Sequence, residues 1–300
     1  MRSLKETPGL SRGVSVDLDT PAPQRAKALS RHHLLLSPGT RWDLTLADVW
    51  QGLTMWRLWG SMGWNDVLQR YRRSLLGPFW LTLSMSIMIG MLGVLYAHLF
   101  GMEIADFMPY LCLGLLIWSF ISTLLNEAGT VFIGSEAYIR QMRLPFTLHV
   151  CRFVWRNLII FAHNAVVYVA IALIFKIALN WSVLLVIPGL LLLLVNGLSI
   201  GVLLGMLSAR FRDIPQIVTS LTQVLFFVTP IVWKPEMLKE RIAFALANPV
   251  HHFIELLRAP LLGDIPSALS YGVALAFTLL SVTASVLLLH RFRSRIAYWI

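Results

Sequence analysis

The chain has 300 residues, of which 57% are hydrophobic and only 13% are charged, and its formal net charge at pH 7 is +10. Soluble domains carry about 25% charged residues, so this composition excludes an ordinary soluble protein and indicates one that lies in a membrane. The positive charge does not indicate nucleic-acid binding, because Arg residues are concentrated beside long apolar stretches, where membrane topology explains them.

The N-terminal region divides into two parts. Residues 1–41 are rich in Pro, Ser and Arg and have no helical or strand periodicity, which predicts a disordered cytoplasmic tail. Within residues 42–78, Leu46, Trp50 and Leu53 recur at helical spacing, and Asp48 lies off this stripe. Trp favours the membrane interface and Arg suits anionic lipid, so we expect an amphipathic helix on the inner leaflet. A helix docked only on protein is the alternative.

Six long apolar stretches follow. A hydrocarbon core about 30 Å thick requires roughly 20 helical residues, and each stretch is long enough to cross it. Because backbone groups in lipid must be bonded internally, the sequence predicts an all-α integral membrane protein with six transmembrane helices. The predicted spans cover residues 79–100, 107–132, 153–175, 182–208, 214–233 and 267–290.

The basic residues indicate an orientation. Arg140, Arg143, Arg210 and Arg212 lie in the connectors after the second and fourth spans, whereas the opposite connectors hold few Lys or Arg. Excess Lys and Arg in short loops stays in the cytoplasm, so both termini and these two connectors are predicted to be cytoplasmic. Glu127, near the inner end of the second span, either pairs with an Arg of the interface helix or faces a polar path.

Two kinds of residue stand out inside the spans. Polar residues in a bilayer are costly and are often functional, although they more often bond a neighbouring helix; here they are His163, Asn164 and Asn196. Glycines at four-residue spacing permit close approach of helices; here they are Gly197, Gly201 and Gly205. The sequence leaves open whether the helix packed on these glycines belongs to the same chain or to a second copy.

Residues 234–264 are too long for a structureless connector. Pro235 and Pro249 can each open a helix, and Phe253, Leu257 and Leu261 then form an apolar stripe. Such helices are too short to span, so we expect a pair of re-entrant or interfacial helices on the outer side. A periplasmic cap lying on the bundle is the alternative.

The sequence predicts no catalytic, cofactor or metal site in this chain. It contains no Gly-x-x-x-x-Gly-Lys-Ser/Thr motif, so ATP and Mg would have to be bound by a partner subunit. The adjacent His251 and His252 project from different faces of a helix, which argues against a shared metal.

Four sequence blocks, in order, resemble the membrane subunits of bacterial type-two ABC exporters for polysaccharides and polyol phosphates. Arg70–Trp80, RYRRSLLGPFW, resembles the segment that opens the first span in this family. Residues 134–145 resemble the cytoplasmic loop between spans two and three, residues 209–214 resemble the inner ARFRD loop, and residues 248–258 resemble an outer helix that begins with Asn-Pro. The resemblance extends from about Leu46 to Ile300.

This resemblance implies a permease in the bacterial inner membrane: a homodimer, paired with two copies of a separate ABC ATPase, that exports a lipid-linked glycan such as O-antigen or capsule polysaccharide. It also implies that the ATPase is contacted through the loop residues Glu136, Tyr138, Arg140, Arg143 and Pro145. Two alternatives stay open, a membrane-embedded glycan polymerase or ligase and a type-two ABC permease for a drug or haem. Which glycan and lipid carrier are recognised is not encoded in a readable motif.

The resemblance also suggests substrate-contacting residues. The first and fifth spans line the channel in this family, and sugar rings have apolar C–H faces that suit aromatic walls. The aromatic candidates are Trp80, Tyr96, Phe226 and Phe227, with ordinary packing as the alternative for each. Arg pairs with phosphate in a bidentate manner, and the candidates for a lipid pyrophosphate head group are Arg70, Arg72 and Arg73. Anchoring on the cytoplasmic side explains the same arginines without a ligand.

Overall fold

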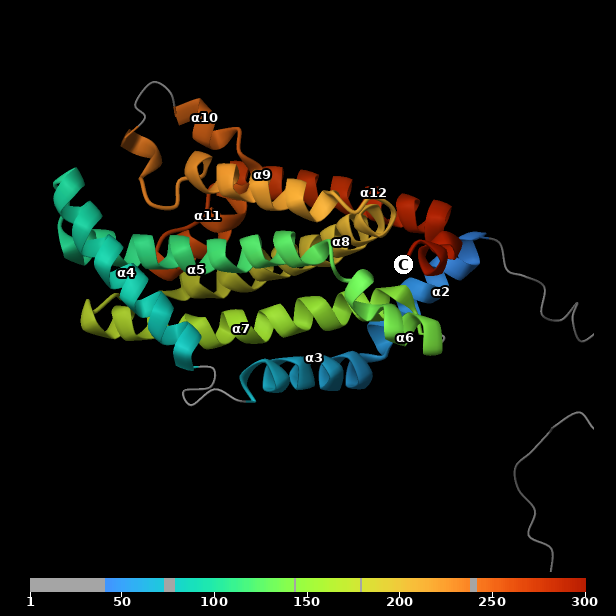
Figure 1. Ribbon diagram of the computed structural model, residues 1–300. Coiled ribbons are helices and arrows are strands. Elements are labelled where there is room, and N and C mark those ends of the chain that lie inside the picture. Colours follow the sequence, from blue (N-terminus) through green and yellow to red (C-terminus); the bar gives the residue numbers. More distant parts are fainter. Residues whose placement is uncertain (1–40, 73–78, 143, 179, 238–241) are drawn as a thin grey trace, which may run out of the picture. The chain divides into compact units, whose positions relative to one another are not determined.

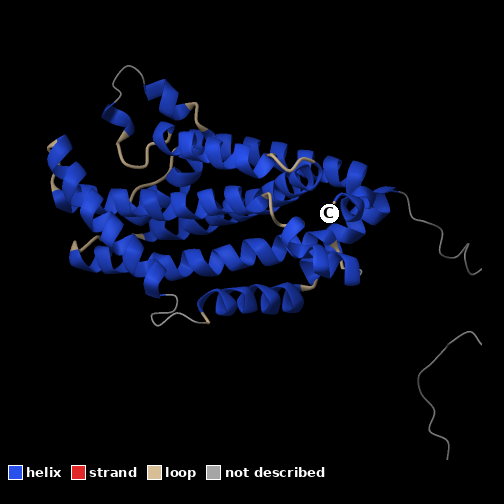
Figure 2. Cartoon of the chain, viewed as in Figure 1, coloured by secondary structure: helices blue, strands red, loops and turns tan. Residues whose placement is uncertain are grey.

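The computed structural model describes residues 41–72, 79–142, 144–178, 180–237 and 242–300, and every regular element in these ranges is a helix (Figure 1, Figure 2). The tail predicted at residues 1–41 lies outside the described residues, apart from Arg41, the first residue of α2. The chain divides into two units, residues 1–44 and residues 45–300, and the second contains all of the helices considered below except the first turn of α2.

The long helices are α4 (Phe79–Phe100), α5 (Ile104–Ala128), α7 (Phe146–Ile174), α8 (Val186–Arg210) and α12 (Ala268–Trp299). Each contains a segment that is long and apolar enough to cross a membrane, and α9 (Ile214–Val228) is a shorter apolar helix. The chain is therefore an all-α, multi-pass membrane protein, and the predicted fold class is confirmed.

Shorter helices precede and connect the long ones. They are α2 (Arg41–Thr54), α3 (Trp56–Tyr71), η1 (Ile133–Ser135), α6 (Glu136–Gln141), η2 (Trp181–Leu185), α10 (Ile242–Leu246) and α11 (Pro249–Leu262). In Figure 1, α5 ends and α7 begins near α6, at the same end of the bundle as the last turns of α12. We call this the arginine-rich end, because Arg140, Arg152 and Arg293 lie in these elements.

Helix α5 is the centre of the bundle. It packs against α4, α7, α8, α9 and α11, and its side chains are buried along most of its length. In contrast, α4 presents large apolar side chains outward, including Met91 at 72% exposure and Leu99 at 67%. A helix that is apolar on its exposed face suits lipid or another subunit rather than water.

Helix α9 is shorter than the apolar stretch 214–233 that contains it. Its 15 residues rise about 22 Å, which is less than the roughly 30 Å hydrocarbon core. It ends because Pro230 lacks an N–H and forces extended backbone on Thr229, whose ψ is 136°. The carbonyl of Pro230 accepts hydrogen bonds from Tyr110 and Arg258, so this irregular backbone is satisfied inside protein.

The glycine stripe of α8 packs within the chain. A Cβ added at Gly197 would lie 3.2 Å from Leu124, one at Gly201 would lie 2.6 Å from Val150, and one at Gly205 would lie 3.0 Å from Phe132. The glycines thus bring the backbone of α8 against α5, α7 and the segment after α5, which answers the question that the sequence left open.

The polar residues of the spans have different environments. Asn196 donates to Thr278 Oγ1 at 2.6 Å and accepts from Ser281 at 2.8 Å, so it bonds α12, as expected for a polar residue between helices. The ring of His163 lies edge-on to Phe79, at 5.7 Å between centroids. Asn164 is buried, and its side-chain oxygen has no hydrogen-bond partner among the described residues.

Between α9 and α12 lie two short helices: α11 begins at Pro249 as expected, whereas α10 begins at Ile242 and not at Pro235. Asn248 caps α11 by accepting from Val250 N at 3.0 Å, Pro249 occupies its first turn, and Gly263 ends it at a φ of 96°. Helix α11 packs on α5, α8 and α12 and is buried along most of its length. A re-entrant position in the membrane stays a prediction.

Candidate functional site

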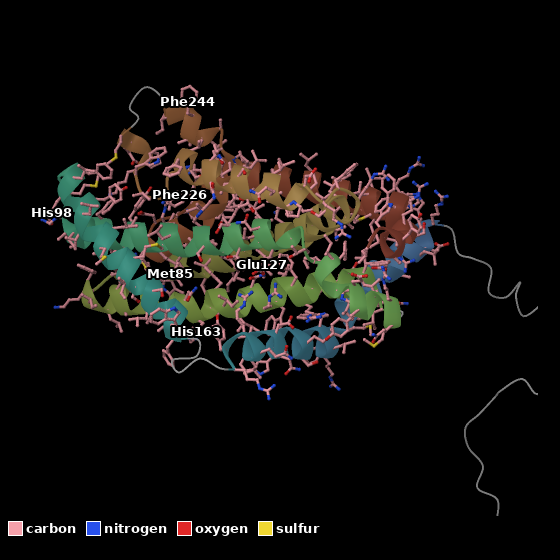
Figure 3. The ribbon with its side chains drawn as sticks, in the orientation of Figure 1. Met85, His98, Glu127, His163, Phe226 and Phe244 are labelled. Atoms are coloured by element: carbon pink, nitrogen blue, oxygen red, sulfur yellow. The ribbon has the colours of Figure 1, made fainter. Side chains whose placement is uncertain are left out.

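A hollow of about 390 Å³ lies between α5 and α9. The side chains that line it are Trp118, Ser122 and Asn126 of α5 and Thr219, Thr222, Gln223, Phe226 and Phe227 of α9. Figure 3 shows Phe226 on the side of α9 that faces α5, and its ring centroid lies 5.8 Å from that of Trp118. Helical spacing explains the arrangement, because residues four apart lie on one face of each helix.

The hollow combines aromatic surface with uncharged hydrogen-bonding groups. Trp118, Phe226 and Phe227 form the aromatic part, with the rings of Phe226 and Phe227 5.3 Å apart. Asn126 donates to Ser122 O at 2.8 Å, while its buried side-chain oxygen has no partner among the described residues. The hollow therefore offers ring faces, hydroxyls and amides together, without a charged side chain in its lining.

Only part of the predicted aromatic wall comes together. Phe226 and Phe227 line the hollow, whereas Trp80 is 56% exposed on α4 and Tyr96 stacks on Phe100 at 5.4 Å. Sequence reasoning missed Trp118, Ser122, Asn126 and Gln223. The signal was present, since polar or amphipathic residues recur every four positions, at 118, 122 and 126, in an otherwise apolar span.

Directly beyond Asn126, a network of ion pairs joins α3, α5 and α7. Glu127 accepts from Arg70 at 3.1 Å, from Arg156 at 2.5 Å and from Asn157 at 3.1 Å. The expected pairing of Glu127 with an Arg of residues 42–78 is observed, and Glu127 also lines a hollow of about 120 Å³ together with Thr130 and His149. Its carboxylate is the link between the end of α5 and both neighbouring helices.

The same network reaches α6. Asp66 of α3 accepts two bonds from Arg152, at 2.5 and 2.7 Å, and the guanidinium of Arg152 lies 5.1 Å from the centroid of the Tyr138 ring. Gly63, one turn earlier in α3, lies so close to α7 that an added Cβ would be 3.1 Å from Arg152 O. Helix α3 therefore packs closely on α7. Other side chains of α3, such as Trp64 and Leu68, are exposed.

Of the three arginines proposed to meet a phosphate head group, the two described ones have different surroundings. Arg70 is paired with Glu127. Arg72 lines a second hollow, of about 620 Å³, whose walls come from α3 and α7 and are mainly apolar, with Leu68 and Ile159 among them. Arg73 lies outside the described residues, as does Arg143 of the loop expected to contact the ATPase.

The other residues of that loop lie on or beside α6. Glu136 and Arg140 form an exposed ion pair at 2.9 Å, and Tyr138 is 38% exposed. Arg140 also donates to Ile300 O at 2.7 Å, which connects α6 to the end of α12. Pro145 is buried at the start of α7. The loop thus presents a short charged helix on a buried base.

Asp48 of α2 was not among the predicted site residues, yet it is almost fully buried at the arginine-rich end. It accepts from Phe146 N at 3.1 Å, from Thr147 N at 3.0 Å and from the Thr147 hydroxyl at 2.9 Å. Arg293 of α12 donates to the same carboxylate at 2.9 Å. The apolar stripe of α2 points the other way, with Leu46 59% and Trp50 70% exposed.

Comparison with known proteins adds two findings. The family model described as "ABC-2 type transporter" matches residues 57–262. The chain is also similar to the O-antigen export system permease protein RfbA of Myxococcus xanthus, with 22% identity over 197 residues, covering 66% of this chain and 76% of that protein. The residues that the family model matches include α6 and those that line the α5–α9 hollow.

Proposed function

Because this chain belongs to the ABC-2 type transporter family, in which it is a membrane subunit, we propose that it exports a lipid-linked polysaccharide across the bacterial inner membrane. O-antigen, capsule or a similar glycan is the substrate class, and the similarity to an O-antigen export permease supports this choice. The observation that carries the proposal is the α5–α9 hollow, whose aromatic faces and uncharged polar groups match the C–H faces and hydroxyls of sugars.

A homodimer completes the pathway in this proposal. The hollow opens beside an exposed apolar face of α9, where Leu221 is 57%, Val224 58% and Phe227 74% exposed. An exposed face of this kind, next to a polar groove, suits a second copy that closes the groove from the other side. Two copies would then enclose a channel of which each supplies half of the wall.

The energy for export comes from a separate ABC ATPase in this proposal, which binds ATP and Mg. The exposed helix α6, with Glu136, Tyr138 and Arg140, supplies a docking surface for it at the arginine-rich end. That end is cytoplasmic in the proposed orientation. ATP binding closes the ATPase dimer and shifts the membrane subunits between closed and open arrangements through their differential affinity for the partner.

The test is export by variants of the hollow. Gln223→Leu removes an amide at similar size, and Phe226→Leu removes a ring. We expect each to lower the export rate about tenfold, because a lost contact of about 1.4 kcal/mol in the limiting step has that effect. Surface polysaccharide is measured in cells that lack their own permease and express the matching ATPase.

Ser61→Ala is the control, because Ser61 is exposed on α3, outside the hollow and the α9 face, and its hydroxyl donates to Leu58 O of its own helix. Normal surface polysaccharide in both hollow variants, at equal abundance of the protein, would show that the glycan does not pass between α5 and α9.

A further inference from the structure

The start of α7 is capped by a residue of a different helix. The first N–H groups of a helix lack internal partners and usually bond a Ser, Thr, Asp or Asn side chain directly before the helix. Here the preceding residue is Pro145, whose side chain cannot accept a hydrogen bond. Asp48 of α2, almost one hundred positions earlier, accepts from Phe146 N and Thr147 N in its place.

The same carboxylate holds α12. Arg293 donates to Asp48 Oδ2 at 2.9 Å, and its guanidinium lies 5.8 Å from the centroid of the Phe146 ring. The Asp48 side chain is 0% exposed, whereas that of Arg293 is 32% exposed. One buried carboxylate therefore bonds the first turn of α7 and the last part of α12 while it is itself fixed on α2.

Helix α2 also packs closely on the first turn of α7 through Gly52. A Cβ added at Gly52, one turn after Asp48, would lie 2.6 Å from Thr147 Cβ and 2.9 Å from Leu148 N. The backbones are too close for water to enter between them. If α7 moved away from α2, the buried carboxylate would lose donors that solvent could not replace, which is strongly unfavourable.

We propose that Asp48 is a positioning residue of the transport cycle: it makes α2, the start of α7 and the end of α12 move together when the η1–α6 segment is displaced. This inference rests on the proposed function, in which an ATPase acts on η1–α6. That segment leads into α7 through Leu144 and Pro145, so its displacement reaches Asp48 through the first turn of α7. Without Asp48, α2 would keep only its packing on the start of α7, and α12 would keep only its link to α6 through Arg140 and Ile300, so both would follow the displaced segment less closely.

The experiment uses the complete complex with its ATPase in proteoliposomes. Asp48→Asn keeps one acceptor oxygen but removes the charge. We expect the ATPase to co-purify and to hydrolyse ATP within about twofold of wild type, while export falls at least about tenfold, the factor that loss of a charge-assisted hydrogen bond corresponds to. Equal losses of hydrolysis, complex formation and export would mean that Asp48 only supports folding, and wild-type export would also overturn the proposal.

A distance measurement tests the same point without export. Spin labels at the exposed positions Gln51 and Met142 report α2 against the end of the η1–α6 segment, and both native cysteines are buried. On ATP binding, the distance distribution should stay narrow in the wild type and broaden in Asp48→Asn. If ATP leaves the wild-type distance distribution narrow and broadens that of Asp48→Asn, but no glycan is exported, the proposed substrate is wrong and the role of Asp48 stands. If the two distributions broaden equally, the role of Asp48 is wrong.

Two further variants complete the design. Arg293→Gln leaves the cap of α7 intact and removes the link to α12, so export should fall by less than in Asp48→Asn with hydrolysis unchanged. Asp264→Asn is the control, an exposed carboxylate in the connector between α11 and α12. If Arg293→Gln matched wild type, α12 would not belong to the junction and the proposal would be overturned in its three-helix form.

Discussion

Arg258 of α11 is a charged residue that is buried inside the protein. Arg258 is 1% exposed, donates to Pro230 O at 2.9 Å and to Glu255 at 2.9 Å, and stacks over the Tyr110 ring at 4.0 Å. It thereby holds the break after α9 against α11 and α5. A guanidinium suits this role because it donates in several directions and stacks on an aromatic face.

Replacing this residue should therefore destabilise the fold. We expect Arg258→Ala to lower the free energy of unfolding by about 3 kcal/mol, because it leaves Glu255 without its partner and a buried carbonyl short of a donor. The measurement is the denaturation midpoint of purified protein. Arg212→Ala, at an exposed arginine, is the control, and equal midpoints for the two variants would contradict the role assigned to Arg258.

Asp48 shows why residue-scale details were missed. Helical spacing correctly separated Asp48 from Leu46, Trp50 and Leu53, but it does not say which face of a helix meets protein. A lone Asp opposite an apolar stripe suggests a water-facing position. In this chain the apolar stripe faces outward and Asp48 faces the bundle, where it caps the first turn of α7, which Pro145 cannot cap. That need becomes visible only when α2 and α7 are placed together.

Helix boundaries, by contrast, follow from local chemistry. Asn248-Pro249 opens α11 and Gly263 ends it, as their residue types predict. The early end of α9 was also readable, since Pro230 lies inside the apolar stretch 214–233. What the sequence could not supply is which helices meet. The α5–α9 hollow needs Ser122 and Asn126 to face Gln223, a register between two spans that no local pattern determines.

At the scale of elements, α6 is the expected contact with the ATPase. Its Glu136–Arg140 pair is exposed, and such pairs contribute about 0–1 kcal/mol to stability. Glu136→Arg should therefore leave folding intact but should abolish export and weaken co-purification of the ATPase, because a reversed charge at a docking surface repels the partner.

The double variant Glu136→Arg with Arg140→Glu separates docking from local pairing. It restores an ion pair within α6 but presents the charges in exchanged positions, so export should stay lost. Glu103→Arg, at an exposed site before α5, serves as the control. Recovery of export in the double variant would mean that only the internal pair matters.

At the scale of the whole molecule, the distribution of arginines predicts how the bundle is oriented. If the arginine-rich end faces the cytoplasm, cysteines introduced at Gly101 and Asn180 should react with an impermeant maleimide in intact cells, whereas one at Met142 should react only after permeabilisation. All three positions are exposed, so burial does not explain a failure to react. Labelling of position 142 in intact cells would show that the arginine-rich end faces outward and would contradict the predicted orientation.

The outward-facing apolar stripe of α2 has a practical consequence for handling the protein. Trp50 at 70% and Leu46 at 59% exposure lie on a helix that precedes the spans, while its carboxylate is buried in the bundle. A detergent belt that covers only the spans leaves this stripe in water, where it promotes aggregation. Extraction therefore calls for an amphiphile whose belt extends beyond the spans to α2, and the choice of detergent should affect recovery of intact protein more than salt or pH does.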